Sequence, residues 1–383
     1  STLINRCLNG IGAVTLVASG TVALAQTTTE PAPLVLNILH MNDHHSHLEA
    51  DDFSYDVSGL GLSTTLQDGS PLEEVDLTYG GFPLLISTMK RMQMNIANPV
   101  TIHAGDAITG TLFYSLFSGE ADAAVMNQIC FDAFALGNHE FDDGDAGLAN
   151  FLEFLASGGC KTPVLSANVV PGSDSPLTAG DYIQPYTIKE VEGQEVGIIG
   201  ISIAQKTLVS SNPDEGTDII DELESAQAAI DELQAMGVNK IILVTHIGYA
   251  NDLALAEGLQ GVDVIVGGDS HSLLGSENLV NAGFEPQGPY PTITSNADGD
   301  RVCVVQAWQY AHLFGRLRVQ FDETGEVRGC RGNPVITLDR DVFFENSDET
   351  NTRLRGDDRR TVLKSLSGLP EFKRDRPDMV TTD

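Results

Sequence analysis

The segment Gly137-Asn138-His139-Glu140-Phe141-Asp142 carries the residue types best suited to chemistry, and it follows the apolar run of residues 131–136. That run is short and rich in large apolar side chains, so it predicts a buried strand ending in a glycine turn. Asp142 stands three residues after His139 and can orient its ring. A histidine held by a carboxylate can donate a proton or stabilise developing negative charge. The alternative is a surface histidine in a helix-capping turn, and this segment alone does not decide between the two.

Metal-binding side chains follow four further apolar runs and, with Asn138, form one set. Asp43 and His45 are two residues apart, so both can turn to one side at a strand's end and grip one ion. The other donors that follow strands are Asp106, His246, Asp269 and His271. Seven oxygen and imidazole donors suit two adjacent cations that share a carboxylate better than one zinc ion with four ligands. The histidines placed outside this ligand set, as neighbouring or core side chains, are His44, His47 and His103.

These donors need strands that deliver them to one edge of a sheet. Short apolar runs predict strands over residues 34–40, 99–106, 131–136, 240–245 and 262–266. Apolar residues at helical spacing predict helices over residues 83–96, 145–157, 218–236 and 251–259. Residues 186–191 and 195–202 predict a hairpin, and residues 49–78 a polar loop over the strand ends. The strand–helix–strand order of residues 218–266 favours an α/β sheet with ligands at the carboxyl ends of its strands.

Composition limits the classes of partner. The 383 residues are 42% hydrophobic, enough for a large core, and 54 Asp and Glu face 21 Lys and Arg, giving a formal charge of −33. This acidity argues against binding to a nucleic acid polymer or an anionic membrane. An anionic substrate would therefore need local cations, which metal ions can supply.

Residues 1–25 have the pattern of an export signal. Arg6 precedes an apolar stretch from Ile11 to Ala25, which ends in the small-x-small site Ala23-Leu24-Ala25. The stretch is short for a membrane span, so we expect a mature chain that starts near Gln26, has no membrane span, and is periplasmic or otherwise exported.

Export gives the cysteines a structural meaning, because disulfides persist in oxidising compartments. Cys7 would leave with the signal, and an even number remains: Cys130, Cys160, Cys303 and Cys330. Three pairings are open, and we favour the sequence-local one, Cys130 with Cys160 and Cys303 with Cys330. The absence of any C-x-x-C spacing argues against a zinc site built from these cysteines.

Five motifs in order resemble the calcineurin-like metallophosphoesterases, specifically the exported 5′-nucleotidase family. The motifs are Asn42-Asp43-His44-His45, Gly105-Asp106, Gly137-Asn138-His139-Glu140, Thr245-His246 and Gly267-Gly268-Asp269-Ser270-His271. The resemblance covers residues 34–338 and is strongest to the bacterial periplasmic NAD nucleotidases. It implies an α/β catalytic domain with two sheets flanked by helices. It also implies a C-terminal nucleotide-binding domain that is mostly missing here. Residues 339–383 would form the linker to that domain and its first part.

The resemblance also implies roles for the donors. One ion would take Asp43, His45, Asp106 and His271, and the other Asp106, Asn138, His246 and Asp269, so that Asp106 bridges the two. His139, oriented by Asp142, would stabilise charge or protonate the leaving group. The cofactors would be two divalent metal ions, with Zn, Mn, Co and Mg as candidates. Many relatives have His where Asp269 stands, and a carboxylate there leaves the metal identity open.

The activity implied is hydrolysis of nucleotides: 5′-nucleotide phosphoesters and the pyrophosphate bond of NAD, giving NMN and AMP and then nucleosides and phosphate. UDP-sugar hydrolases and 2′,3′-cyclic-nucleotide phosphodiesterases use similar centres and remain alternatives within the enzyme class. The rival class is a non-catalytic metal- or nucleotide-binding protein, against which the presence of His139 and Asp142 argues. The preferred nucleotide and the oligomeric state are not predicted.

Overall fold

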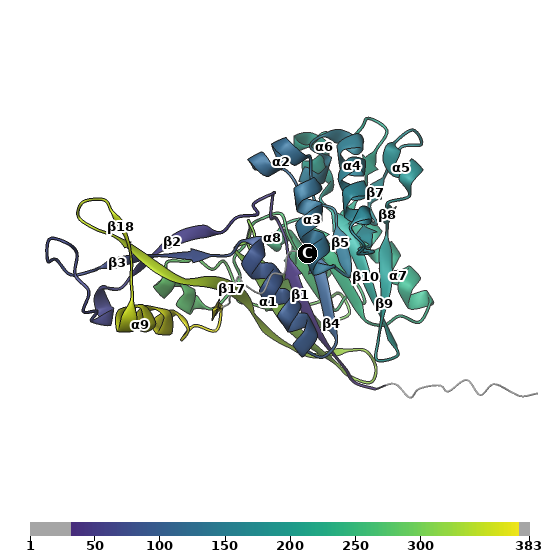
Figure 1. Cartoon of the computed structure of the whole chain (residues 1–383). Helices are drawn as coiled ribbons and strands as arrows, with labels where there is room; N and C mark the ends of the chain where they lie inside the picture. Colours follow the sequence, from purple (N-terminus) through teal and green to yellow (C-terminus); the bar gives the residue numbers. More distant parts are fainter. Residues whose placement is uncertain (1–31, 375–383) are drawn as a thin grey trace, which may run out of the picture. The chain divides into compact units, whose positions relative to one another are not determined.

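The computed structural model describes residues 32–374, which fold around two β-sheets (Figure 1). The expected export signal lies outside the described residues. In spatial order the larger sheet contains β2 (Asp51–Asp56), β3 (Glu74–Tyr79), β17 (Val327–Glu345), β16 (Leu313–Phe321), β1 (Leu34–Met41), β4 (Pro99–His103), β5 (Ala133–Ala135), β6 (Val164–Leu165) and β8 (Ile183–Gln184), with β18 (Asn351–Arg353) and β19 (Phe372–Arg374) paired to β17. The smaller sheet contains β14 (Thr292–Ser295), β15 (Arg301–Gln306), β13 (Val264–Gly267), β12 (Ile241–His246), β10 (Gln194–Ser202) and β9 (Tyr186–Val191). A separate pair consists of β7 (Val169–Val170) and β11 (Asp218–Ile219).

The described residues contain nine helices, several of which pack on the two sheets. They are α1 (Phe82–Asn95), α2 (Leu112–Phe117), α3 (Glu120–Ile129), α4 (Gly144–Ser157), α5 (Pro176–Gly180), α6 (Ala204–Ser210), α7 (Glu222–Ala235), α8 (Tyr249–Gly258) and α9 (Gly356–Leu366), with short 3-10 turns η1 (Ser58–Leu60), η2 (His139–Phe141) and η3 (Glu277–Ala282). Apolar side chains of α1, α3 and α4 share a core with the larger sheet, and those of α7 and α8 share one with the smaller sheet. A third core, which includes Ile38 and Ile242, joins strands of both sheets. The expected fold class, two sheets flanked by helices, is confirmed.

Parallel strands bring the polar loops together. β1, β4 and β5 are neighbours in the larger sheet, and β10, β12 and β13 are neighbours in the smaller one. The registers pair Met41 with His103 and Ser202 with His246, so the carboxyl ends of these strands are level. Because strands of this kind release their loops at one edge, the loops after β1, β4, β5, β12 and β13 meet there.

The expectation of a polar loop over residues 49–78 is wrong. β2 and β3 form an antiparallel hairpin there, and β3 pairs with β17. Tyr79 and Leu338 lie in a fourth apolar core, which α9 completes. β17 also runs through Leu338, the expected end of the catalytic part, so residues on both sides of that position belong to one strand.

The helix expected over residues 218–236 begins later than predicted. Ile219 lies in β11, and α7 starts at Glu222 after the N-cap Asp221, whose carboxylate accepts from Glu224 N at 2.9 Å. Leu223, in the first turn of α7, is 44% exposed. A capping carboxylate satisfies an otherwise unpaired N–H group. The cap at Asp221 therefore determines where the helix begins, although the apolar pattern predicted an earlier start.

The favoured disulfide pairing is confirmed. Cys130 at the end of α3 is bonded to Cys160 beyond α4, and Cys303 of β15 is bonded to Cys330 of β17. Among residues 32–374, none of the helices is both long enough and apolar enough to cross a bilayer.

Candidate metal centre

Six of the seven predicted donors lie in loops at the carboxyl edge of the two sheets, and the seventh, His246, is the last residue of β12. Five of them have a left-handed backbone: φ is 50° at Asp43, 47° at His45, 53° at Asp106, 77° at Asp269 and 49° at His271. Residues other than glycine adopt such φ values at a cost, and they concentrate where the surroundings impose a functional geometry. The strain at these positions therefore marks the loops as a built site.

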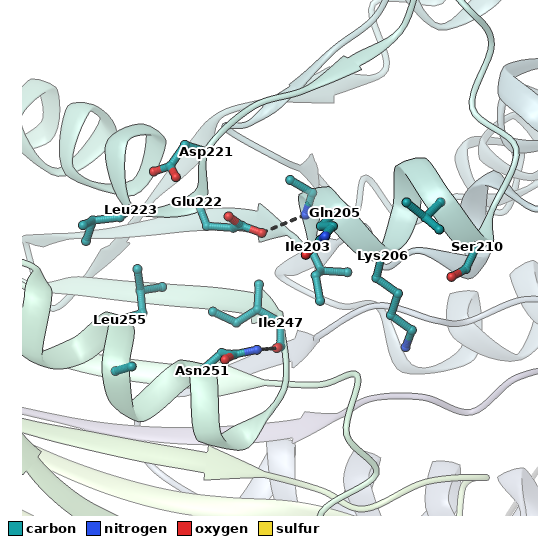
Figure 2. A pocket seen from close by; sticks show the side chains of 13 residues that line it. Ile203, Gln205, Lys206, Ser210, Asp221, Glu222, Leu223, Ile247, Asn251 and Leu255 are labelled. Atoms are coloured by element: carbon teal, nitrogen blue, oxygen red, sulfur yellow. Dashed lines mark hydrogen bonds between the residues drawn. The ribbon is translucent and has the colours of Figure 1, made fainter.

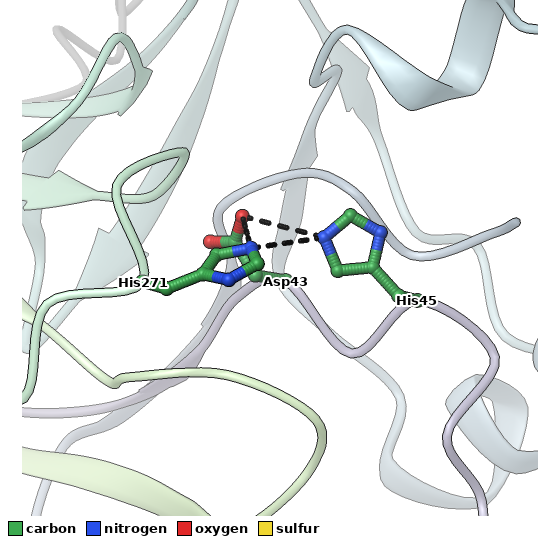
Figure 3. A group of neighbouring side chains, drawn as sticks. All are labelled: Asp43, His45 and His271. Carbon is green, nitrogen blue, oxygen red and sulfur yellow. Dashed lines mark hydrogen bonds and ion pairs between the residues drawn. The ribbon is translucent and has the colours of Figure 1, made fainter. Parts of the chain in front are cut away.

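Asp43, His45 and His271 form the first group of donors (Figure 3). His271 Nε2 lies 3.2 Å from Asp43 Oδ1 and 3.1 Å from His45 Nε2, and His45 Nε2 lies 3.8 Å from Asp43 Oδ1. Burial raises the pKa of Asp43, but the three neighbouring imidazoles, His246 first, outweigh it and hold the pKa below its usual value. This carboxylate stays charged in an interior position.

Asp106, Asn138, His246 and Asp269 form the second group. His246 Nε2 lies 2.9 Å from Asp106 Oδ2 and 3.8 Å from Asp269 Oδ1, and the side-chain amide of Asn138 lies 3.2 Å from that same Asp269 oxygen. Asp106 Oδ2 also lies 3.7 Å from His45 Nε2, so Asp106 faces both groups. Asp43 reaches the second group as well, at 3.8 Å from His246 Nε2.

The donor set fits cations, because it brings the carboxylates of Asp43, Asp106 and Asp269 together with three imidazoles. His246 Nδ1 lies 2.7 Å from the carbonyl of Ala104, which can only accept, so Nδ1 carries a proton and Nε2 is the ring nitrogen that faces Asp106. His246 is fully buried, so its contact with the Asp106 carboxylate is shielded from water. Burial lowers the pKa of His246, yet the carboxylates of Asp106, Asp43 and Asp269 raise it well above its usual value. The position therefore attracts positive charge, which a divalent ion can supply.

Glu140 organises the backbone around these donors, and the sequence analysis gave it no role. Its buried carboxylate accepts from Gly137 N at 2.6 Å, Asp106 N at 2.9 Å and Ala107 N at 2.7 Å. One side chain thus ties the loop after β4 to the loop after β5. Charge-assisted bonds to backbone N–H groups are among the stronger hydrogen bonds, so Glu140 holds Asp106 and Asn138 in register.

His139 and Asp142 form the predicted pair beside the donors. His139 Nδ1 lies 2.6 Å from Asp142 Oδ2, and His139 N donates to Asp106 Oδ1 at 2.9 Å. The Asp142 hydrogen bond raises the pKa of His139 above its usual value, against an opposing effect of burial. His139 is 38% exposed, and its ring centroid is 5.0 Å from that of His45, so the ring stands at the open side of the centre.

A second hydrogen-bond network supports the loop after β1, and it was not predicted from the sequence. His44 Nδ1 lies 2.9 Å from His103 Nε2, His44 Nε2 lies 3.2 Å from Asp122 Oδ1, and Ser46 Oγ donates to Asp122 Oδ2 at 2.9 Å. All four side chains are buried. His44 and His103 are therefore neighbouring and core histidines, as predicted, and Asp122 of α3 anchors the loop that carries Asp43 and His45.

Lys206 of α6 reaches the centre from the side, and its ammonium contacts Asp269 Oδ1. Burial lowers the pKa of Lys206, but Asp269, Asp106 and Asp43 raise it above its usual value, so the residue is charged. Lys206 also lines a pocket of about 860 Å³ between α6, α8 and the start of α7 (Figure 2). Asn251 and Ile247 line the same pocket, and Ile247 directly follows the donor His246.

Comparison with known proteins identifies the class. Residues 36–273 match the family model described as calcineurin-like phosphoesterase, so the chain belongs to that family. This stretch contains all seven donors together with His139 and Asp142.

Its relatives include named nucleotidases. The chain is 40% identical over 338 residues to a probable 5′-nucleotidase of Treponema pallidum (88% of this chain, 54% of the relative) and 37% identical over 362 residues to the NAD 5′-nucleotidase of Haemophilus influenzae (94% and 57%). The solved structure of H. influenzae NAD nucleotidase matches with a TM-score of 0.80 at 36% identity (90% and 57%), and that of a Thermus thermophilus 5′-nucleotidase precursor with 0.68 at 39% (79% and 54%). The chain thus spans little more than half the length of these relatives.

Proposed function

We propose that the protein is an exported, dinuclear-metal nucleotide phosphohydrolase that cleaves 5′-nucleotide phosphoesters and the pyrophosphate bond of NAD. The observation that carries the proposal is the convergence of seven donors, three of them carboxylates, with His139 and Asp142 at the open side. The named activities of the relatives support the nucleotide as substrate, and the similarity to NAD 5′-nucleotidase supports NAD. The two disulfides support an oxidising compartment.

Within this proposal the donors hold two divalent ions, of which Zn, Mn, Co and Mg are the candidates, with Asp106 facing both. Such ions supply positive charge that lowers the pKa of water and offsets the charge of phosphoryl oxygens. His139 keeps Nδ1 on Asp142 and offers Nε2 to the substrate. Water forms the new bond to phosphorus, the bond to the leaving oxygen breaks, and His139 donates a hydrogen bond or the proton to the oxygen that gains charge.

We further propose that residues 34–338 are the catalytic part and that residues 339–383 lead into a second domain that grips the nucleotide. The greater length of the relatives supports a further domain, while β17 and α9 pack part of residues 339–383 against the catalytic part. Substrate choice would then depend on both domains.

The test is metal analysis together with phosphate release from AMP, NMN, NAD, UDP-glucose and 2′,3′-cyclic AMP by the full-length protein. We expect about two ions per chain, and hydrolysis of AMP, NMN and NAD. Asp106→Asn should lower the affinity for both ions, because it removes charge from the carboxylate that faces both groups. Unchanged metal content with retained activity in this variant would contradict the shared-carboxylate assignment. Chromatography of the products that shows cleavage confined to UDP-glucose or the cyclic nucleotide would contradict the substrate assignment.

A further inference from the structure

Lys206 and Asp269 form an ion pair at the edge of the candidate metal centre. The ammonium contacts Asp269 Oδ1, the oxygen that faces Asn138 at 3.2 Å and His246 at 3.8 Å. Lys206 is 38% exposed and Asp269 is 12% exposed, so the pair lies between solvent and the buried donors. Lys206 is therefore placed to affect both the second group of donors and any anion that approaches it.

The net charge of the donors and their two metal ions explains why a positively charged side chain is needed beside Asp269. The carboxylates are Asp43, Asp106 and Asp269, and the other four donors are neutral. Two divalent ions bring four positive charges and the carboxylates remove three, which leaves the centre with one positive charge. A neutral ligand at position 269 would leave the centre with two positive charges. The Lys206 ammonium restores the second positive charge.

This difference matters for a phosphate ester, which is an anion attracted by the net charge of the centre. The chain as a whole has a formal charge of −33, so its long-range field repels such a substrate. A charge in contact with Asp269 and partly shielded from water acts on the centre with little screening by salt.

We propose that Lys206 is the charge-compensating partner of Asp269 and keeps the centre attractive to phosphate anions, without helping to hold the metal ions. The inference rests on the proposed two-metal function and deepens it. An ammonium beside a metal site repels the ion, so removal of the ammonium should leave metal affinity unchanged or raise it, while phosphate binds more weakly. A lysine that merely fixes the position of Asp269 would behave differently, since its loss would lower metal affinity.

The experiment uses calorimetric titration of the full chain, first with Mn²⁺ after chelation and then with inorganic phosphate after loading. In Lys206→Met we expect Mn²⁺ affinity at or above that of the wild type and phosphate affinity lower by on the order of tenfold. Lys206→Arg keeps the charge and should keep phosphate affinity. The matched control is Lys189→Met, which removes a similarly exposed lysine from an ion pair with Asp132 and should change neither affinity.

A double variant tests the charge count itself. Asp269→His combined with Lys206→Met has the same net charge as the wild-type centre and should recover phosphate affinity lost in Lys206→Met. Suppose that the wild type binds two Mn²⁺ ions. Unchanged phosphate affinity in Lys206→Met would then contradict the Lys206 proposal alone, and so would a loss of Mn²⁺ affinity in that variant. Fewer than two Mn²⁺ ions in the wild type would overturn the two-metal function and the charge count with it.

Discussion

His139 separates catalysis from binding at the scale of single residues. It adjoins the donor Asn138, but its Nδ1 is bonded to Asp142 at 2.6 Å and its ring is partly exposed. We expect His139→Asn to retain nearly full metal content while kcat falls by on the order of 100-fold or more, because the lost interaction is made mainly in the transition state. Metal analysis and steady-state kinetics on one preparation provide the measurement.

The partner residue supplies the control for that prediction. Asp142→Asn should also lower kcat, but by less than His139→Asn does. The kcat losses of the two variants should not add in the double variant, because the two side chains act as a unit. Loss of metal in His139→Asn would make His139 a ligand, and unchanged kcat would remove it from the mechanism.

Asp122 gives the protein a pH-dependent stability. Burial raises its pKa from 3.8 to about 7, against an opposing hydrogen bond from Ser46. A carboxyl group whose pKa is raised in the folded state contributes stability that is full below its unfolded pKa and is lost as pH rises to about 7. We therefore expect the free energy of unfolding in chelator to fall less between pH 5 and pH 8 in Asp122→Asn than in the wild type, as measured by urea titration.

Ser46→Ala is the matched control, because it removes the hydroxyl partner at 2.9 Å and keeps the titrating carboxyl group. This variant should retain the pH dependence. An identical pH dependence in Asp122→Asn and the wild type would assign the effect to other groups.

The donors were predictable from sequence because each follows an apolar strand within a short polar motif, and the structure brings all seven together. Lys206 and Asp122 carry no such signal, and Glu140 lies in the same motif as Asn138 but is not a predicted donor. Glu140 acts through its bonds to backbone N–H groups, and Lys206 and Asp122 reach the site from helices 63 and 79 residues away in sequence from Asp269 and Asp43 respectively. Their roles depend on tertiary contacts, which spacing along the chain does not encode.

At the scale of elements, the apolar strands and the hairpin of β9 and β10 were predicted well, but the polar strand β2 was not. β1 and β12 are apolar and buried along their length, so a short apolar run identifies them. β2 has the sequence Asp-Asp-Phe-Ser-Tyr-Asp, with Phe53 and Tyr55 partly buried between exposed neighbours. This alternation is the available signal for a strand with one covered face, but its polar composition favoured a loop.

The Cys303–Cys330 disulfide joins β15 of the smaller sheet to β17 of the larger one. Its removal by Cys330→Ser, with Cys303→Ser, should lower the free energy of unfolding by about 2–4 kcal/mol, because the unfolded chain gains the freedom of an open loop. Urea titration measures the change. The comparison is the variant with both Cys130→Ser and Cys160→Ser, which removes the disulfide between the ends of α3 and α4. Thiol titration of the denatured wild type should find all four of these cysteines oxidised, and free thiols at Cys303 or Cys330 would contradict the pairing.

At the scale of the whole molecule, the charge of −33 predicts a response to salt. Repulsion between like charges disfavours the compact state, and salt screens it over a Debye length of about 8 Å at physiological ionic strength. We expect Tm to rise between low salt and about 0.15 M NaCl, as followed by calorimetry in chelator. A Tm that falls over this range would show that favourable ion pairs outweigh the repulsion, and an equal concentration of sucrose controls for effects unrelated to charge.

Two glycines beside the donors limit which sequences can encode this site. A Cβ at Gly137 would lie 2.2 Å from Asp106 Oδ1, and one at Gly268 would lie 2.4 Å from the carbonyl of Ala104 and 2.7 Å from His246 Nδ1. Neither glycine offers an atom to a metal ion, yet even alanine would displace a donor or its support. In a saturation mutagenesis library selected for growth on a nucleotide, both positions should therefore be as intolerant of change as the ligands themselves.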